Sequence, residues 1–183
     1  TSVRFTGGEP LLRKGLPAIV AAAHQFGAQT ALTTNGLGLQ HMARALQDAG
    51  LDRVNVSLDS VDAASYAEIT RRDRLDDVIA GLEAAAAAGL SPVKVNAVLL
   101  RGVNDTQAPD LLRWCLDRGY ELRFIEQMPL DPQHGWRRDD MVTADETLEL
   151  LSAAHRLTAL DGRGSAPAAR SRRGRWRPSG AAP

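Results

Sequence analysis

Cysteine is almost absent from this sequence: Cys115 is the single example among 183 residues. One cysteine excludes an internal disulfide framework, and it excludes a metal site built from several thiolates of this chain. Cys115 lies in the mostly apolar stretch 111–116 of a predicted helix. We therefore predict a packed thiol rather than a nucleophile.

Long hydrophobic runs are also missing. No stretch approaches the roughly 20 apolar residues that a helix needs to cross a bilayer, so we expect no membrane partner and a cytoplasmic location. Hydrophobic residues make up 44% of the chain and charged residues 24%. These values are typical of one globular domain that is long enough to bury a core.

Net charge is absent too, but the charges are unevenly distributed. Residues 161–183 contain six arginines and one aspartate, whereas residues 1–160 are net acidic. We predict a folded core over 1–160 and a basic low-complexity tail over 161–183 that is disordered or translated out of frame. The alternative is an arm that binds DNA or RNA, which predicts salt-sensitive binding; we expect no nucleic-acid partner.

Strand and helix patterns alternate along the core. Extended stretches predict strands at about 2–6, 30–34, 53–58, 93–100 and 121–126. Apolar residues at helical spacing predict helices at 15–26, between Gly36 and Gly50, after Asp62, at 75–88, up to Arg118, and at 144–155. Asp62 should cap the third helix and Asp105 or Thr106 the fifth, while residues 143–146 match a capping box.

This alternation predicts parallel strands joined by right-handed crossover helices. A doubly wound sheet and a (βα) barrel both fit the pattern. No Gly-x-Gly-x-x-Gly follows any strand, which weakens the dinucleotide-binding version of the doubly wound sheet.

Polar residues end or interrupt every predicted strand. They are Thr6 to Glu9, Thr33 to Gly36, Asn55, Ser57 to Ser60, Lys94, Asn96, Arg123 and Glu126. Parallel strands that are buried on both faces are nearly all Val, Ile and Leu. The polar residues therefore either pair with one another, for example Lys94 or Arg123 with Glu9, Asp59 or Glu126, or they line a ligand site at the carboxyl ends of the strands.

The types of side chain favour an anionic ligand. Side chains alternate along a strand, so Lys94 and Asn96 must point the same way. Cationic Arg4, Lys94 and Arg123 would suit a phosphate or carboxylate. Neutral Ser57, Thr33 and Asn96 would suit ribose hydroxyls or an amino-acid group.

Six segments of the chain together carry a resemblance to a known family. They are Arg4 to Arg13, Leu32 to Gly36, Val54 to Ser60, Val93 to Asn96, Arg101 to Asp105 and Leu122 to Met128. These segments resemble the radical S-adenosylmethionine (SAM) enzymes and, within them, the GTP 3′,8-cyclase family, molybdenum cofactor biosynthesis protein A. The Gly-Gly-Glu-Pro turn at 7–10 is typical of the superfamily, and the last three segments in this order are typical of the cyclases.

The resemblance implies a partial (βα) barrel with helices outside, here truncated at its N-terminus to about five parallel strands. It also implies S-adenosyl-L-methionine and [4Fe-4S] clusters as cofactors and GTP as the substrate. In the family, the reduced cluster cleaves SAM to a 5′-deoxyadenosyl radical that abstracts the 3′ hydrogen of GTP. The C3′ radical attacks C8 of guanine, and the product, (8S)-3′,8-cyclo-7,8-dihydroguanosine 5′-triphosphate, leads to cyclic pyranopterin monophosphate.

The resemblance also assigns binding roles to residues of this chain. The SAM site is expected at Gly7, Gly8, Glu9, Ser57 and Met128. The GTP site is expected at Arg4, Thr33, Lys94 and Arg123. No catalytic side chain and no metal ligand of this chain is implied. The family often has a basic residue where this chain has Ser2, which would weaken binding of the triphosphate.

Both cysteine motifs of the family are missing from this chain. One is a Cys-x3-Cys-x2-Cys loop upstream of the glycine turn, and the other is a set of three cysteines near the C-terminus. We therefore expect a lyase fragment that is inactive by itself. The alternatives are a radical SAM enzyme for another substrate and a non-catalytic nucleotide-binding module. In the full-length form the resemblance implies a homodimer and a functional link to cyclic pyranopterin monophosphate synthase.

Overall fold

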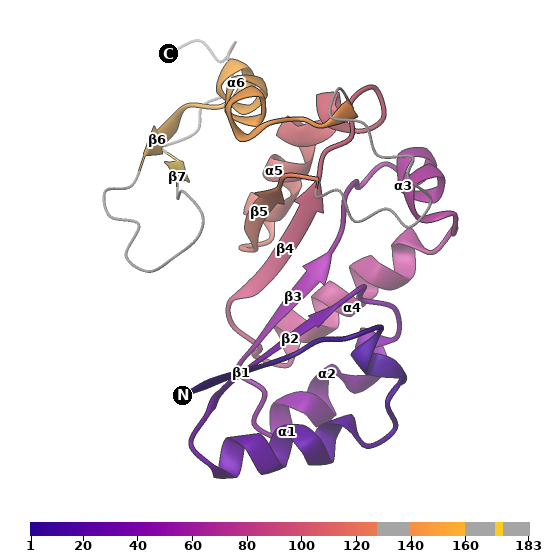
Figure 1. Ribbon diagram of the computed structural model, residues 1–183, viewed down its shortest axis with the longest axis vertical. Helices are drawn as coiled ribbons and strands as arrows, with labels where there is room; N and C mark the ends of the chain where they lie inside the picture. Colours follow the sequence, from indigo (N-terminus) through magenta and orange to yellow (C-terminus); the bar gives the residue numbers. More distant parts are fainter. Residues whose placement is uncertain (128–139, 160–170, 174–183) are drawn as a thin grey trace.

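The centre of the molecule is a parallel five-stranded sheet. The structure, a computed structural model, describes residues 1–127, 140–159 and 171–173. The strands of the sheet are β1 (Ser2–Phe5), β2 (Gln29–Thr34), β3 (Arg53–Ser57), β4 (Val93–Val98) and β5 (Glu121–Ile125). They pair in the order β1-β2-β3-β4-β5, and every pairing is parallel (Figure 1).

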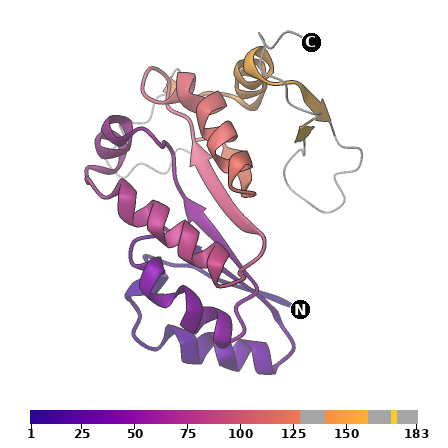
Figure 2. The same cartoon turned by 180° about the vertical axis from the view of Figure 1, so that it is seen from behind.

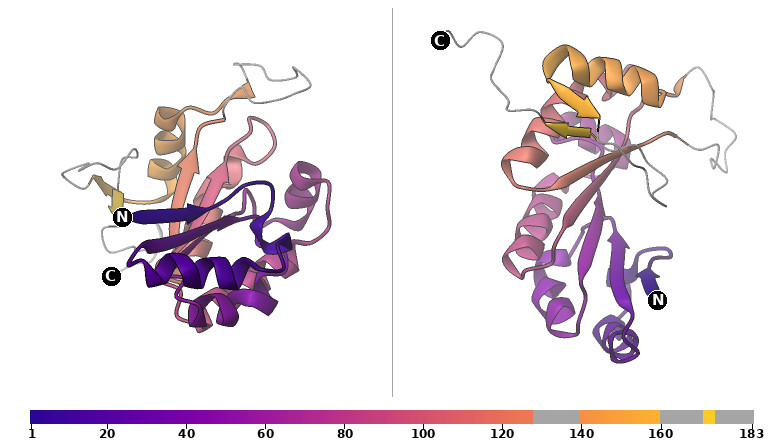
Figure 3. Two further views of the ribbon diagram at one scale, coloured as in Figure 1. Left: turned by 60° about the horizontal axis from the view of Figure 1, so that its bottom comes forward. Right: turned by 90° about the vertical axis from the view of Figure 1, so that its left-hand side faces the viewer.

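Helices connect consecutive strands. They are α1 (Leu16–Gln25), α2 (Leu39–Asp48), α3 (Ala63–Thr70), α4 (Leu75–Ala87) and α5 (Ala108–Asp117), with the short 3-10 helices η1 (Pro10–Leu12) and η2 (Asp105–Gln107). Seen from behind, α1, α2, α4 and α5 lie in front of the sheet (Figure 2). The right-hand view of Figure 3 shows the same one-sided arrangement and places β1 at an edge.

The strand order decides between the two architectures that the sequence left open. A doubly wound sheet reverses its order partway and carries helices on both faces. Here each strand lies beside its predecessor, so right-handed crossovers put all the connecting helices on one face. The protein is an α/β partial barrel of five parallel strands.

Apolar side chains between the sheet and the helices form the main core. Leu32, Val54, Val56 and Val95 of the strands are fully buried there against residues of α1, α2, α4 and α5. The alternation of each strand sends every second side chain to this layer. Cys115 of α5 is also fully buried in it, which confirms the predicted packed thiol.

Most predicted boundaries are confirmed within two residues. Asp62 caps α3 by accepting a hydrogen bond from the amide of Ser65 (2.9 Å), and Thr143 and Glu146 form the capping box of α6 (Ala144–Ala154). The predicted cap of α5 was wrong. Asp105 belongs to η2, and α5 begins at Ala108 after Gln107, because a first turn of 3-10 helix resembles the start of an α-helix in sequence.

The last described elements extend the fold beyond β5. α6 packs on α5 through a small cluster of Leu99, Ala108, Val142 and Leu151. β6 (Leu157–Ala159) pairs with β7 (Ser171–Arg173) in an antiparallel ribbon, so three residues of the predicted basic tail are in a strand. Within the described part of the chain, every helix is too short or too polar to span a membrane.

Candidate functional site

The face of the sheet opposite the helices is polar. Strand register places a set of polar residues there, which we call the open face: Arg4, Thr33, Asn55, Ser57, Lys94, Asn96 and Arg123. In β2 to β5, Thr33 lies opposite Asn55, Asn55 opposite Lys94, Ser57 opposite Asn96, and Asn96 opposite Arg123. Side chains on the same face of adjacent paired strands are close neighbours. The structure therefore puts the residues predicted at the GTP site on one face of the sheet, together with Ser57 from the predicted SAM site. Arg4 and Arg123 lie on the two edge strands, β1 and β5.

The glycine turn lies at the carboxyl end of β1. Gly7 has a φ of 137°, which only glycine adopts readily, and both Gly7 and Gly8 are exposed. A Cβ atom added to either glycine would meet no other atom within 4 Å. The main chain of this turn is therefore open to a ligand at the rim of the open face.

The carboxylate of Glu9 is engaged within the protein. It accepts hydrogen bonds from the amide of Leu11 (3.0 Å), the hydroxyl of Thr34 (2.7 Å) and the amide of Asn35 (2.8 Å). These bonds tie the glycine turn to the end of β2. The structure thus shows Glu9 as a link between two strand ends, and its predicted contact with SAM stays a prediction.

Lys94 is paired, but not with any of the acidic residues suggested by the sequence. Its Nζ lies 2.5 Å from Oε2 of Glu121, its partner across the β4–β5 pair. The Lys94 side chain is 14% exposed and that of Glu121 50% exposed. Glu9 binds β2, Asp59 accepts from the amide of Val98, and Glu126 accepts from the amide of Ala144. The predicted pairing was wrong because register, which the sequence does not display, selects the partner.

The other cations of the open face carry uncompensated charge. Within residues 1–127 and the two later described stretches, Arg4 and Arg123 make no ion pair or hydrogen bond through their side chains. Arg4 is exposed and Arg123 is partly buried. Two free guanidinium groups on one face favour binding of a phosphate or carboxylate group.

Neutral polar groups lie between these cations. Asn55, 3% exposed, donates a hydrogen bond to the hydroxyl of Thr33 (3.2 Å), and this bond orients both side chains. Ser57 is exposed. The Oδ1 atom of Asn96 is buried and accepts no hydrogen bond from any described residue. A buried acceptor without a donor is costly unless a ligand or water supplies one. Met128 lies outside the described residues.

Sequence reasoning missed a buried link at the strand ends. Asn104, fully buried, donates to the carbonyl groups of Asp59 and Val98 (2.8 and 3.0 Å) and accepts from the amide of Leu100 (2.7 Å). It lies in a turn after β4, where an asparagine is ordinary. Its sequence position therefore carries no sign of this role.

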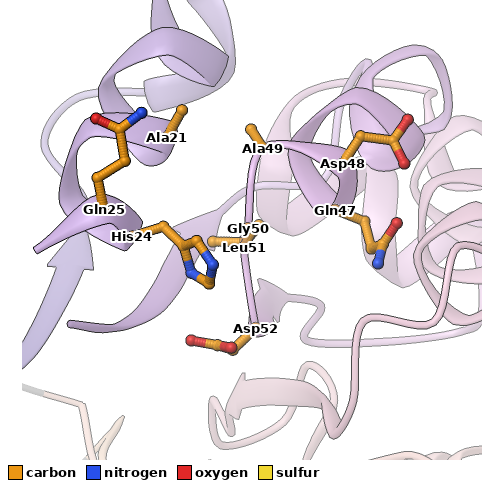
Figure 4. A pocket seen from close by; sticks show the side chains of 9 residues that line it. All are labelled: Ala21, His24, Gln25, Gln47, Asp48, Ala49, Gly50, Leu51 and Asp52. Atoms are coloured by element: carbon orange, nitrogen blue, oxygen red, sulfur yellow. The ribbon is translucent and has the colours of Figure 1, made fainter. Parts of the chain in front are cut away.

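A pocket of about 490 Å³ lies at the other end of the sheet. It is formed where α1 and α2 end and β3 begins, and Figure 4 shows His24 facing the segment Gly50–Asp52 there. The carboxylate of Asp52 already accepts hydrogen bonds from the amide and the hydroxyl of Thr30 (2.6 and 3.1 Å). In parallel α/β folds ligands bind at the carboxyl ends of strands, so the open face is the better candidate site.

A metal site requires several ligating side chains close together. Over the described ranges, no three or more His, Cys, Asp or Glu side chains are grouped so as to hold one. Burial raises the pKa of Cys115 to about 12, which keeps its thiol protonated. The arrangement is chemically suited to bind an anionic molecule with hydroxyl or amino donors.

Comparisons with known proteins agree with the fold and add a family. Residues 1–115 match the model of the radical SAM superfamily. GTP 3′,8-cyclase of Streptomyces coelicolor is 59% identical over 172 residues, which cover 92% of this chain and 50% of the relative. GTP 3′,8-cyclase of Mycolicibacterium smegmatis is also 59% identical, over 173 residues that cover 92% of this chain and 47% of the relative. The chain spans about half the length of the curated relatives it matches.

Solved structures are similar in fold at much lower identity. A domain of pyruvate-formate lyase-activating enzyme from Bacteroides vulgatus has a TM-score of 0.61 at 19% identity, over 83% of this chain and 93% of that domain. At this identity the likeness concerns the fold alone.

Proposed function

The chain belongs to the radical SAM superfamily, and we propose that it forms the nucleotide-binding part of a GTP 3′,8-cyclase of molybdenum cofactor biosynthesis. The observation that carries this proposal is the strand register, which puts Arg4, Lys94 and Arg123 on one face. Two guanidinium groups without an ion pair among the described residues, together with Lys94 paired to Glu121, suit the phosphates of a nucleoside triphosphate. The 59% identity to a protein of this name supports the choice of GTP.

The residues present fit S-adenosylmethionine. The open main chain at Gly7 and Gly8 can accept from an amino group or donate to a carboxylate. Ser57 is free to bind a ribose hydroxyl, and the unsatisfied Oδ1 of Asn96 lies across the β3–β4 pair from it. When bound, S-adenosylmethionine would supply the means to abstract a hydrogen atom from the substrate.

The residues present do not fit an iron–sulfur cluster. Such clusters are held by cysteine thiolates, and the single cysteine of this chain is buried in the core. We therefore propose that the cluster ligands come from other parts of the complete protein.

The proposed work of this chain is to bind and orient GTP. Arg4 and Arg123 attract the phosphates with charges that no described carboxylate compensates. Glu121 holds Lys94 in place through their ion pair. An ammonium has three N–H donors, so Lys94 can also donate a hydrogen bond to a phosphate. Thr33, fixed by Asn55, offers its hydroxyl to the ribose or base.

A chimeric enzyme tests the proposal. In it, residues 1–159 replace the matching part of the Streptomyces coelicolor relative, and anaerobic GTP consumption is measured after cluster reconstitution. We expect activity in the chimera. Lys94→Gln in the chimera should raise KM for GTP by about 10- to 100-fold, since a hydrogen bond to a charged group contributes about 1.5–3 kcal/mol.

The control removes an equal charge away from the open face. Arg44 lies on α2 and pairs with Asp48 in the helix layer, so Arg44→Gln should leave KM unchanged. Equal effects of the two substitutions would refute the proposed GTP site. An active chimera that consumes another substrate but not GTP would favour a different radical SAM enzyme.

Two results with the isolated chain bear on the alternatives. If the chain alone assembled a [4Fe-4S] cluster and consumed GTP, the proposal that it lacks the cluster ligands would be wrong. If the chain bound GTP while the chimera stayed inactive, a non-catalytic nucleotide-binding module would be favoured. A cytoplasmic location, a homodimer and a functional link to cyclic pyranopterin monophosphate synthase are further proposals for the complete protein.

A further inference from the structure

The ladder between β3 and β4 ends in an unusual way. Ser57 and Asn96 are the last paired residues, and the amide of Leu58 still donates to the carbonyl of Asn96 (2.9 Å). A regular parallel ladder would continue with the amide and carbonyl of Val98 bonded to the backbone of β3. Instead, the amide and the carbonyl of Val98 each form a hydrogen bond with a side chain.

Asp59 and Asn104 provide these side chains. Oδ1 of Asp59 accepts from the amide of Val98 (2.8 Å), and Nδ2 of Asn104 donates to the carbonyl of Val98 (3.0 Å). Nδ2 of Asn104 also donates to the carbonyl of Asp59 (2.8 Å), so the same amide group joins both strand ends. Side chains thus replace the backbone bonds and satisfy both backbone groups of Val98. We call the hydrogen bonds of Asp59 and Asn104 to Val98 the clamp.

A second set of hydrogen bonds joins the segments that follow β3 and β4. The hydroxyl of Ser60 donates to Oε1 of Gln107 (2.6 Å), and Nε2 of Gln107 donates to the hydroxyl of Ser65 (2.7 Å). Ser65 in turn donates to the carboxylate of Asp62, the cap of α3. The loops after β3 and β4 are therefore joined by polar side chains along the rim of the sheet.

The clamp begins two residues beyond the last pair of open-face residues, Ser57 and Asn96. Ser57 is exposed, and Asn96 carries the buried acceptor that has no donor among the described residues. Each lies two residues before the backbone that the clamp holds, at Asp59 and Val98. Burial raises the pKa of the Asp59 carboxyl, and the hydrogen bond from the amide of Val98 opposes this shift.

We propose that Asp59 and Asn104 are positioning residues, which end the β3–β4 ladder and hold Ser57 and Asn96 at the distance that S-adenosylmethionine requires. This inference rests on the proposed function, because it takes Ser57 as a SAM-binding residue. Neither Asp59 nor Asn104 needs to touch the ligand. Their effect passes through the backbone of Val98 and the adjoining ends of the two strands.

Two substitutions of Asp59 in the full chain separate the effect of its hydrogen bond to Val98 from the effect of its negative charge. Asp59→Ala removes the acceptor for the amide of Val98, whereas Asp59→Asn keeps an oxygen at the same place. We expect Asp59→Ala to speed amide hydrogen exchange at Val98 by about tenfold, as the loss of one hydrogen bond predicts. Exchange at Val95, in the middle of β4, should not change. Asp59→Asn should exchange as the wild type does.

Equilibrium binding of S-adenosylmethionine to the same chains gives the second measurement. The expected result is about a tenfold loss of affinity in Asp59→Ala and its rescue in Asp59→Asn. Asn104→Ala should cause a similar loss of affinity and should speed exchange at Leu100, whose amide donates to Oδ1 of Asn104, provided that circular dichroism shows a folded chain. If Asn104→Ala does not fold, the Asp59 pair decides alone.

Each other outcome counts against a stated claim. Unchanged exchange at Val98 in Asp59→Ala would overturn the clamp. Faster exchange with unchanged SAM affinity would overturn the positioning role, since the clamp would then be structural only. If the wild-type chain binds no S-adenosylmethionine, the proposed binding function fails together with the positioning role, while the exchange rates still decide whether the clamp exists.

Discussion

Gly36 offers a sharp test of how the turn after β2 is built. It follows the open-face strand that carries Thr33, and its φ is 84°. A Cβ atom at this position would lie 2.9 Å from Cγ1 of Val56 and 3.0 Å from Cγ1 of Val78. Gly36→Ala therefore combines backbone strain with overpacking between β3 and α4.

Gly38 separates these two costs. Its φ is 82°, nearly the same, but an added Cβ would meet nothing within 4 Å. Gly38→Ala should cost only the left-handed conformation, about 1–2 kcal/mol. Gly36→Ala should add about 1–3 kcal/mol for the crowding of two valines, so the sum is about 2–5 kcal/mol.

Urea unfolding of the two variants and the wild type, followed by circular dichroism, measures the difference. We expect midpoints in the order wild type, Gly38→Ala, Gly36→Ala, with unchanged slopes. If the two variants have the same free energy of unfolding within about 0.5 kcal/mol, which is the usual limit of additivity, the close packing of Gly36 against Val56 and Val78 would be refuted.

Three further predictions concern titratable groups. Burial raises the pKa of Cys115 from 9.0 to about 12, so the folded chain should react with a disulfide reagent at least about 10³-fold more slowly than the unfolded chain; equal rates would contradict a buried thiol. Because burial raises the pKa of Asp59 above 3.8, its contribution to stability is fully present below that pH and is lost as pH rises through the folded-state value. Asp59→Asn should therefore gain stability relative to the wild type between pH 3 and 7 in thermal melts, and a constant difference would show that the carboxyl is not desolvated. The amide of Thr143, followed by Arg101, lowers the pKa of Glu146 to about 2 from 4.5, so its contribution is present above pH 4.5 and is lost as pH falls toward 2. Glu146→Gln should flatten the stability profile in that acid range, and a profile as steep as that of the wild type would disprove the linkage.

Local patterns account for most of the fold that could be predicted. Helical spacing of apolar residues, glycines at helix ends and caps such as Asp62 depend on neighbours in sequence, so they can be read without tertiary structure. The same is true of the polar residues that interrupt the strands. The start of α5 was misjudged for the opposite reason: η2 and the first turn of α5 differ in hydrogen bonding, not in residue preference.

The candidate site was predicted in composition but not in its internal contacts. The family resemblance predicted a GTP site at Arg4, Thr33, Lys94 and Arg123, and strand register puts these residues on one face of the sheet. The sequence did not indicate that Lys94 would pair with Glu121, since that depends on the β4–β5 register. The roles of the individual residues in binding GTP and S-adenosylmethionine stay predictions.

The sequence by itself determined that this is a chain of alternating strands and helices with one buried thiol and no cysteine set for a cluster. Those properties follow from residue types and short-range periodicity. Tertiary structure alone decided the sequential strand order, the engagement of Glu9 by the end of β2, and the clamp of Asp59 and Asn104 on Val98. Each of these joins residues that are more than five positions apart, and the free energy that selects such partners comes from packing and backbone satisfaction in the folded state.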